Sequence, residues 1–230
     1  MSKIKSHQRV NDILLGPLER PALAWLAAHQ PAWMTPDILT IIGIFGSVLI
    51  FVSYALSRIN PAFLWLASLG FVINWYGDSL DGTLARHRKI ERPKYGFFVD
   101  HIVDAISEVM VFLGLGLTYY VRFDIAAIAL VGYLLMSVYV YVTTAVTGVF
   151  QISYGKFGPT EVRVLAILAN TAMFFFGTAV ILREPIDISI YDVFVAIVAV
   201  ALYGIFIGKS LQQAKILDKE DRARAAAKTE

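Results

Sequence analysis

The sequence contains no cysteine, which excludes disulfides, thiolate nucleophiles and cysteine-ligated zinc or iron–sulfur centres. Histidine is also scarce, and the four histidines do not cluster, so a hard cation held by carboxylates is favoured over zinc. The formal charge of +2 over 230 residues gives no reason to expect a nucleic-acid partner. The N-terminal twenty-odd residues are polar and basic without an apolar signal-peptide core, so no cleaved signal is expected.

Apolar residues are what the chain has in excess. They make up 57% of the sequence, and the mean hydropathy is +0.64, which is typical of an integral membrane protein rather than a soluble domain. Six stretches approach the roughly 20 residues that a helix needs to cross a bilayer. They are residues 38–57, 62–81, 95–120, 125–149, 161–182 and 188–209.

The segment 10–31 is too polar to cross and is predicted to be an amphipathic helix lying at the membrane interface. The expected fold is therefore an all-α integral membrane protein, with six transmembrane helices preceded by an N-terminal interfacial helix. We divide the chain into an interfacial cytoplasmic segment 1–36, a six-helix domain 37–209 and a charged cytoplasmic tail 210–230.

The basic residues predict the orientation in the membrane. Seventeen of the 20 Lys and Arg fall in the N-terminal segment, the loop 86–94, the loop around 156–163 and the C-terminal tail. Cytoplasmic loops carry such an excess, so both termini and these loops are expected on the cytoplasmic side of a cell membrane.

Four aspartates in or beside these apolar stretches carry the chemistry. Asp78 and Asp81 are three residues apart, and Asp100 and Asp104 are four apart, so each pair can share one helical face. Carboxylates at membrane depth are costly and usually line a cavity, bind cations or pair with positive charge. Two such helices packed antiparallel would present a set of oxygen ligands able to hold two divalent ions beside a pyrophosphate.

Small and basic residues accompany the first pair. Gly82 and Ala85 would let a nucleotide or its phosphates lie close to the backbone. Arg86, beyond Asp81 on the same segment, can contact phosphate oxygens with its planar guanidinium.

The pattern Asp78-x-x-Asp81-Gly82-x-x-Ala85-Arg86, followed by Gly96-x-x-x-Asp100-x-x-x-Asp104, resembles the signature of the CDP-alcohol phosphotransferases. These are integral membrane enzymes of phospholipid synthesis, generally six-helix homodimers. The sequence departs from the family in one place, because the nine residues between Arg86 and Gly96 are one more than the pattern usually has.

The resemblance implies a role for each matching residue. Asp78, Asp81 and Asp100 would bind two Mg²⁺ or Mn²⁺ ions per subunit, and Asp104 would act as the general base and also contact a metal. Gly82, Ala85, Arg86 and Gly96 would surround the CDP group.

The segment Thr35-Pro36-Asp37-Ile38-Leu39-Thr40 is similar to an element that precedes the first span in this family. The resemblance implies that Asp37 and Thr40 contact the nucleotide. The alternative is a helix that begins at Pro36 with Thr35 as its N-cap.

Lys156, Arg163 and Lys209 could form a pocket for a phosphorylated acceptor beside the aspartates, as in members that resemble phosphatidylinositol-phosphate synthases. The alternative is that they follow the positive-inside rule and meet anionic lipid headgroups. Two further residues adjoin the acidic pattern. Glu108 would extend the polar cavity or, as we favour, pair with a basic residue on another helix, and His101 is expected to have a structural or interface role.

The expected reaction is transfer of a phosphatidyl group from a CDP-linked donor, CDP-diacylglycerol, to a small polar alcohol with release of CMP. Besides the membrane lipids, the expected partners are these two substrates and a second copy of the chain. One alternative reverses the substrates, with CDP-choline or CDP-ethanolamine donating its headgroup to diacylglycerol. Another is a cation transporter that uses the intramembrane carboxylates.

Overall fold

The computed structural model describes residues 9–10, 14–148, 150–151, 158–182 and 187–227. Helices account for most of these residues. They are α1 (Gly16–Ala28), α2 (Pro36–Leu56), α3 (Phe63–Arg88), α4 (Pro93–Gly116), α5 (Phe123–Thr147), α6 (Pro159–Phe176) and α7 (Ile190–Ala226).

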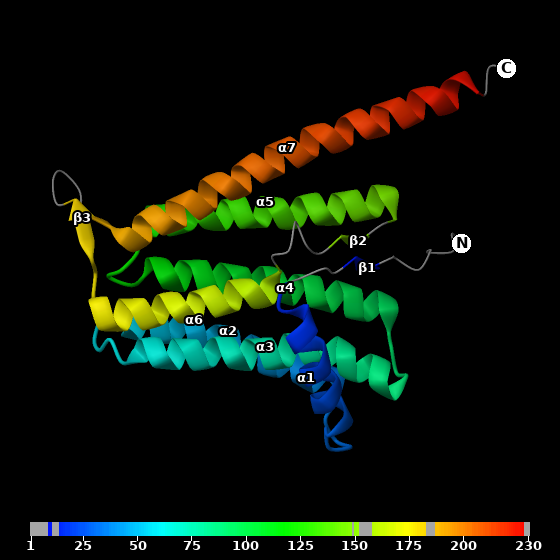
Figure 1. Ribbon diagram of the computed structural model, residues 1–230. Helices are drawn as coiled ribbons and strands as arrows, with labels where there is room; N and C mark the ends of the chain where they lie inside the picture. The colour runs from blue at the N-terminus through cyan, green and yellow to red at the C-terminus, as the bar shows by residue number, and fades with distance from the viewer. Residues whose placement is uncertain (1–8, 11–13, 149, 152–157, 183–186, 228–230) are drawn as a thin grey trace.

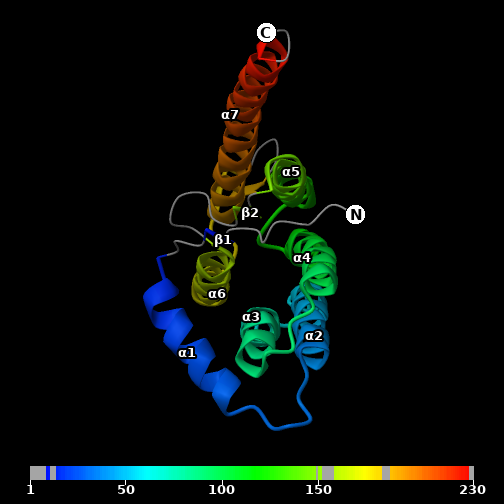
Figure 2. The same ribbon diagram turned by 90° about the vertical axis from the view of Figure 1, so that its right-hand side faces the viewer.

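The six long helices α2 to α7 run side by side as a bundle, and α7 projects beyond it toward the C-terminus (Figure 1). Seen along the bundle, α1 lies on the outside, beside α3 and α6, and runs transverse to them rather than parallel (Figure 2). Helix α1 lies within the predicted N-terminal segment 10–31 and is shorter than it, and an interfacial position for it stays a prediction.

Among the described residues, four helices, α2, α5, α6 and α7, are long and apolar enough to cross a membrane. This confirms a helical membrane architecture but not the count of six spans. Helices α3 and α4 have 26 and 24 residues, so they are long enough. They carry the acidic motif, and its polar side chains lower their mean hydropathy.

The predicted span 161–182 is too long. Helix α6 ends at Phe176, and Gly177 and Ala179 both adopt positive φ angles, 66° and 42°. This backbone conformation cannot continue a right-handed helix. The chain then forms β3 (Val180–Leu182), which pairs antiparallel with β4 (Ile188–Ser189).

The C-terminal tail and a short strand pair complete the fold. Helix α7 continues without a break to Ala226, so the charged residues from 210 to 226 are a largely exposed helical extension of the last predicted span. Strands β1 (Arg9–Val10) and β2 (Phe150–Gln151) form a short parallel pair. The fold is therefore helical with two small two-stranded additions.

Helices α2 and α3 approach each other through glycines. A Cβ atom at Gly77 would lie 2.3 Å from the backbone nitrogen of Gly43, and one at Gly46 would lie 2.5 Å from that of Asn74. Small residues at such positions let membrane helices pack backbone to backbone. Because Gly77 directly precedes Asp78, this contact fixes the height and rotation of the acidic motif against α2.

Helix α1 is fastened to the bundle by polar contacts at the same end. Trp75 Nε1 on α3 and Thr160 Oγ1 on α6 both donate hydrogen bonds to Glu19 Oε1, at 2.8 and 2.6 Å. Arg88 donates to backbone carbonyls of the segment between α1 and α2, including Met34 O at 2.6 Å and Pro31 O at 2.9 Å. Helix α1 thereby joins α3 to the start of α6.

Candidate active site

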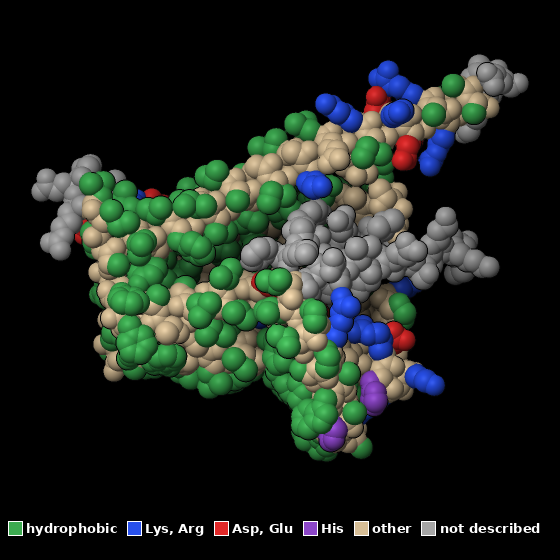
Figure 3. All heavy atoms as spheres, in the orientation of Figure 1, with side chains coloured by type: hydrophobic (Ala, Val, Ile, Leu, Met, Phe, Trp, Pro, Cys, Tyr) green, Lys and Arg blue, Asp and Glu red, His purple; other side chains and the backbone are tan. Residues whose placement is uncertain are grey.

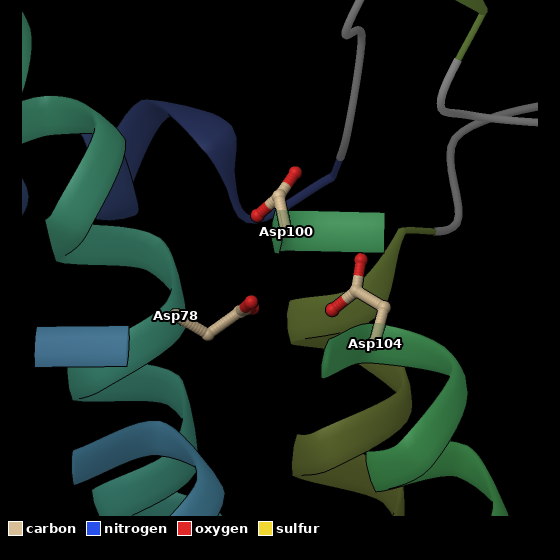
Figure 4. A group of neighbouring side chains, drawn as sticks. All are labelled: Asp78, Asp100 and Asp104. Atoms are coloured by element: carbon tan, nitrogen blue, oxygen red, sulfur yellow. The ribbon is translucent and has the colours of Figure 1, made fainter. Parts of the chain in front are cut away.

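Three aspartates from two helices converge at one place. Asp78 on α3 and Asp100 and Asp104 on α4 each offer a carboxylate oxygen, and these oxygens lie within 4.8 Å of one another. Figure 4 shows the three side chains pointing toward one another. All three are half-buried. The spacing of the two acidic pairs predicted that the helices could present carboxylates to each other, and these three do.

The donor set fits a hard divalent cation. Mg²⁺ takes carboxylate oxygens at about 2.0–2.1 Å, so two oxygens on opposite sides of one ion are about 4 Å apart. The cluster of Asp78, Asp100 and Asp104 approaches that size and supplies oxygen ligands alone. Small side-chain movements would bring these oxygens to the distances that Mg²⁺ or Mn²⁺ requires.

Asp81 lies outside this group of three. Its Oδ2 accepts a hydrogen bond from Thr40 Oγ1 at 2.7 Å, and its Oδ1 accepts one from the Gly82 backbone N–H at 2.5 Å. Thr40 also donates to Pro36 O at 3.1 Å. The start of α2 therefore holds the fourth aspartate in an orientation of its own.

Arg163 joins the cluster from α6. Its Nη2 donates to Asp78 Oδ2 at 2.5 Å, and its Nε donates to Asn74 Oδ1 at 2.8 Å. The Arg163 and Asp78 side chains are only 13% and 18% exposed, so the ion pair is largely shielded from solvent. Attraction between opposite charges is stronger in such surroundings than at the surface.

The structure describes two of the three basic residues of the predicted pocket, so the pocket stays a prediction. Lys156 lies outside the described residues. Lys209 is exposed on α7, and no hydrogen bond or ion pair between described residues connects it to the carboxylates. Of the two described members, Arg163 contacts the acidic cluster.

The segment before α2 shows the capping arrangement. Thr35 Oγ1 accepts a hydrogen bond from the Ile38 backbone N–H at 3.2 Å, with Pro36 as the first helical residue. Asp37 forms an ion pair with Arg92, just before α4, and both side chains are about half exposed, at 47% and 50%. Helix α2 is therefore tied to the connection between α3 and α4.

Space is open beside the residues that the resemblance assigns to CDP. A Cβ atom at Gly82 would meet the flexible guanidinium end of Arg86 at 3.3 Å, and one at Gly96 would meet nothing within 4 Å in the part of the chain that the structure describes. Ala85 is half-buried and Arg86 is exposed, with its Nη2 donating to Thr83 Oγ1 at 3.2 Å. Neither glycine is therefore closed off by the backbone of another described element.

Glu108 and His101 have contacts within the bundle. Glu108 accepts a hydrogen bond from Ser137 Oγ on α5, at 3.2 and 3.4 Å to its two oxygens, and this described contact is with a hydroxyl rather than with the basic partner that we favoured. His101 is buried, with Nδ1 donating to Phe97 O at 2.6 Å and its ring edge-on to Tyr141. Both residues link α4 to α5.

Sequence reasoning missed Asn74. It lies one turn before Asp78, on the same face of α3, and is 6% exposed. A buried amide at an i−4 position from a motif aspartate is a usable signal, because buried polar groups are almost always hydrogen-bonded. Its partner Arg163 lies 89 residues away along the chain, so the pairing itself requires the fold.

The sequence matches the CDP-alcohol phosphatidyltransferase family over residues 33–206. This range covers both helices of the acidic cluster and most of the chain. The protein belongs to the CDP-alcohol phosphatidyltransferase family.

Individual relatives agree with this assignment. The chain is 29% identical to cholinephosphotransferase 1 of Gallus gallus over 176 residues, which is 73% of this chain and 51% of that protein. It is 33% identical to archaetidylinositol phosphate synthase of Pyrococcus horikoshii over 105 residues, 45% of this chain and 52% of that one. The chain thus spans about half the length of these curated relatives.

A solved structure has a similar fold. The phosphatidylinositol phosphate synthase of Mycobacterium tuberculosis, crystallised with CDP-DAG bound, superposes with a TM-score of 0.53 at 22% identity. The similarity covers 85% of this chain and 90% of the mycobacterial one. The bundle described above is therefore a fold that this family uses.

Proposed function

We propose that the protein transfers a phosphatidyl group from CDP-diacylglycerol to a small polar alcohol and releases CMP. The observation that carries this proposal is the convergence of Asp78, Asp100 and Asp104 within 4.8 Å, inside the region that matches the family. The mycobacterial protein of similar fold binds CDP-DAG, which supports the choice of donor.

The chain's own residues suit each part of this reaction. Asp78, Asp100 and Asp104 would hold the divalent ions, Mg²⁺ or Mn²⁺, with Asp81, oriented by Thr40, as a further ligand. When bound, such ions offset the negative charge of a diphosphate and orient it. Gly82, Ala85, Arg86 and Gly96, with Asp37 and Thr40 on α2, would receive the CDP group.

The bond changes follow from that placement. The alcohol oxygen forms a bond to the phosphorus that carries the diacylglycerol group. The bond between this phosphorus and the bridging oxygen of the diphosphate breaks, and CMP leaves with that oxygen and the bonding electron pair. Asp104 takes the proton of the alcohol as general base.

The position of Arg163 supports the proposal that the acceptor alcohol carries a phosphate. Its guanidinium is at the carboxylate cluster, and its Nη1 is buried without a hydrogen-bond partner among the described residues. An unpaired buried donor is costly, and a phosphate oxygen would satisfy it. Lys156 and Lys209 remain proposed as further contacts to that phosphate.

The proposal extends to membrane topology. Helices α2 to α7 would form six spans, and the acidic cluster with both termini would face the cytoplasm. In support, α3 and α4 lie within the bundle, and Lys and Arg side chains gather toward the end from which α7 projects (Figure 3). A homodimer, as in the family, is part of the proposal.

A second candidate is supported by the chicken relative, which is a cholinephosphotransferase. In that case CDP-choline or CDP-ethanolamine would donate its headgroup to diacylglycerol, with the same carboxylates in the same roles.

One assay separates the candidates. The purified full chain is incubated with Mn²⁺ and either radiolabelled CDP-diacylglycerol plus a panel of free and phosphorylated alcohols, or CDP-ethanolamine plus diacylglycerol. CMP release with the first donor supports the proposal, and release with the second alone supports the alternative. Ion flux in vesicles without CMP release from either donor would indicate a cation transporter instead.

A further inference from the structure

We infer that Asn74 is a positioning residue that holds Arg163 on Asp78, so that Arg163 acts as an internal counter-ion which a metal must displace. The inference rests on the metal site of the proposed function. The two residues to which it assigns a role, Asn74 and Arg163, lie outside the family's acidic pattern.

Asn74 is anchored on both sides of its amide. Its Oδ1 accepts from Arg163 Nε at 2.8 Å, while its Nδ2 donates to Gly43 O at 3.1 Å and to Ser47 Oγ at 3.0 Å on α2. The amide cannot rotate without losing several bonds. It therefore presents a fixed acceptor to the guanidinium.

The anchoring continues to the helix of the other two aspartates. Ser47 Oγ donates to Ser107 Oγ on α4 at 2.8 Å, and Ser107 follows Asp104 by three residues. A single chain of polar contacts thus runs from α4 through α2 and α3 to Arg163 on α6. These four helices surround the carboxylate cluster.

Arg163 needs such a support. An arginine side chain has many rotamers, and a guanidinium held at two nitrogens is fixed both in position and in rotation. Asp78 takes one of these nitrogens and Asn74 the other. With Asn74 absent, a single bond to Asp78 would remain among these contacts, and the guanidinium could turn away.

The positive charge of Arg163 affects how tightly the carboxylate cluster would bind a metal ion. A divalent ion and Arg163 both require the carboxylate of Asp78, and two cations in one shielded site repel each other. A well-placed Arg163 stabilises the acidic cluster while no ion is bound and weakens ion binding by competition. Loosening Arg163 should therefore tighten the binding of the metal.

Asn170 provides a matched control. It is also a buried asparagine at the contact between α3 and α6, 1% exposed, where it accepts from Tyr54 OH at 2.9 Å and donates to Ser68 Oγ at 3.2 Å. None of these partners belongs to the acidic cluster.

The test measures Mn²⁺ binding to the full chain in detergent, from the electron paramagnetic resonance signal of free Mn²⁺. Asn74→Leu should tighten binding by about fivefold, a size typical of coupling between contacting residues. Arg163→Gln should tighten it at least as much. Asn74→Leu should add nothing in the Arg163→Gln background, and Asn170→Leu should leave binding as in the wild type.

Several results would overturn the inference. They are unchanged Mn²⁺ binding in Asn74→Leu, an undiminished effect of Asn74→Leu in the Arg163→Gln background, or the same tightening in Asn170→Leu. If Asn74→Leu does not fold, Ser47→Ala is measured in its place, because Ser47 anchors the Asn74 amide. This variant should tighten Mn²⁺ binding slightly in the wild-type background and not in the Arg163→Gln background, and any other result overturns the inference. A wild type that binds no Mn²⁺ also overturns the inference, whereas one that binds Mn²⁺ and releases no CMP refutes only the proposed function.

Discussion

Thr40 Oγ1 donates a hydrogen bond to Asp81 Oδ2 at 2.7 Å, across 41 residues of sequence. This bond connects the first turns of α2 to the acidic motif of α3, and it explains why Asp81 is turned differently from the other three aspartates. Asp81 and Thr40 thus depend on each other for their orientation. The resemblance nevertheless implies separate roles for them, with Asp81 as a metal ligand and Thr40 as a nucleotide contact.

Thr40→Val should lower kcat for CMP release by about tenfold, since a shift of about 1.4 kcal/mol in the barrier has that effect. The hydroxyl that orients Asp81 would be lost, while side-chain volume is kept. Thr171→Val is the matched control, because Thr171 also donates to a carbonyl one turn back on its helix, Ile167 O at 2.8 Å, and has no carboxylate partner among the described residues. Equal kcat in the two variants would show that Asp81 needs no support from Thr40.

Asp104→Asn should reduce kcat by about 100-fold or more, because the proton acceptor for the alcohol is lost. The protein should still insert and fold, since the change replaces one oxygen. Asp124→Asn, at the start of α5 where Asp124 pairs with Arg122, should leave turnover unchanged. Normal turnover from Asp104→Asn would place the base elsewhere.

Gly77→Ala should destabilise the bundle by about 3 kcal/mol, measured by thermal unfolding in detergent. The added methyl group would lie 2.3 Å from Gly43 N and 2.4 Å from Leu39 O, and backbone atoms cannot move aside cheaply. Gly204→Ala on α7, where a Cβ meets nothing within 4 Å among the described residues, should unfold at the wild-type temperature or above it, because alanine favours a helix more than glycine does. A Gly77→Ala variant as stable as Gly204→Ala would contradict the close packing of α2 on α3.

Glu19→Ala should lower the stability of the chain by about 2 kcal/mol, the scale of hydrogen bonds to a charged acceptor. Both bonds that join α1 to α3 and α6, from Trp75 and Thr160, would be lost. Trp75 fluorescence should then report a change of environment. Glu220→Ala on the exposed end of α7 should change neither property, and an unaltered melting curve for Glu19→Ala would mean that α1 is held by other contacts.

Local spacing was sufficient to predict part of the site. The intervals Asp78–Asp81 and Asp100–Asp104 depend only on helix geometry, so the sequence indicated which faces carry carboxylates. Which oxygens meet depends on the rotation of α3 against α2, and that is set by the contact of Gly77 with Gly43. Asp81 was therefore expected among the converging ligands, and the structure places it on Thr40 instead.

Contacts between distant helices were beyond sequence reasoning. The sequence groups Arg163 with Lys156 and Lys209, either as a phosphate pocket or as residues that follow the positive-inside rule, because all three are basic and near one predicted membrane boundary. The bonds of Arg163 to Asn74 and Asp78 depend on α6 packing against α3. The early end of α6 has a local cause, the positive φ angles at Gly177 and Ala179, but an alanine in that conformation cannot be recognised from its sequence.

The most direct measurement of the central claim is Mn²⁺ binding to the purified wild type, to Asp100→Asn and to Asp124→Asn. The account predicts saturable binding in the wild type and in Asp124→Asn, and a loss of most of that binding in Asp100→Asn. Equal binding in all three proteins would contradict a metal centre formed by Asp78, Asp100 and Asp104.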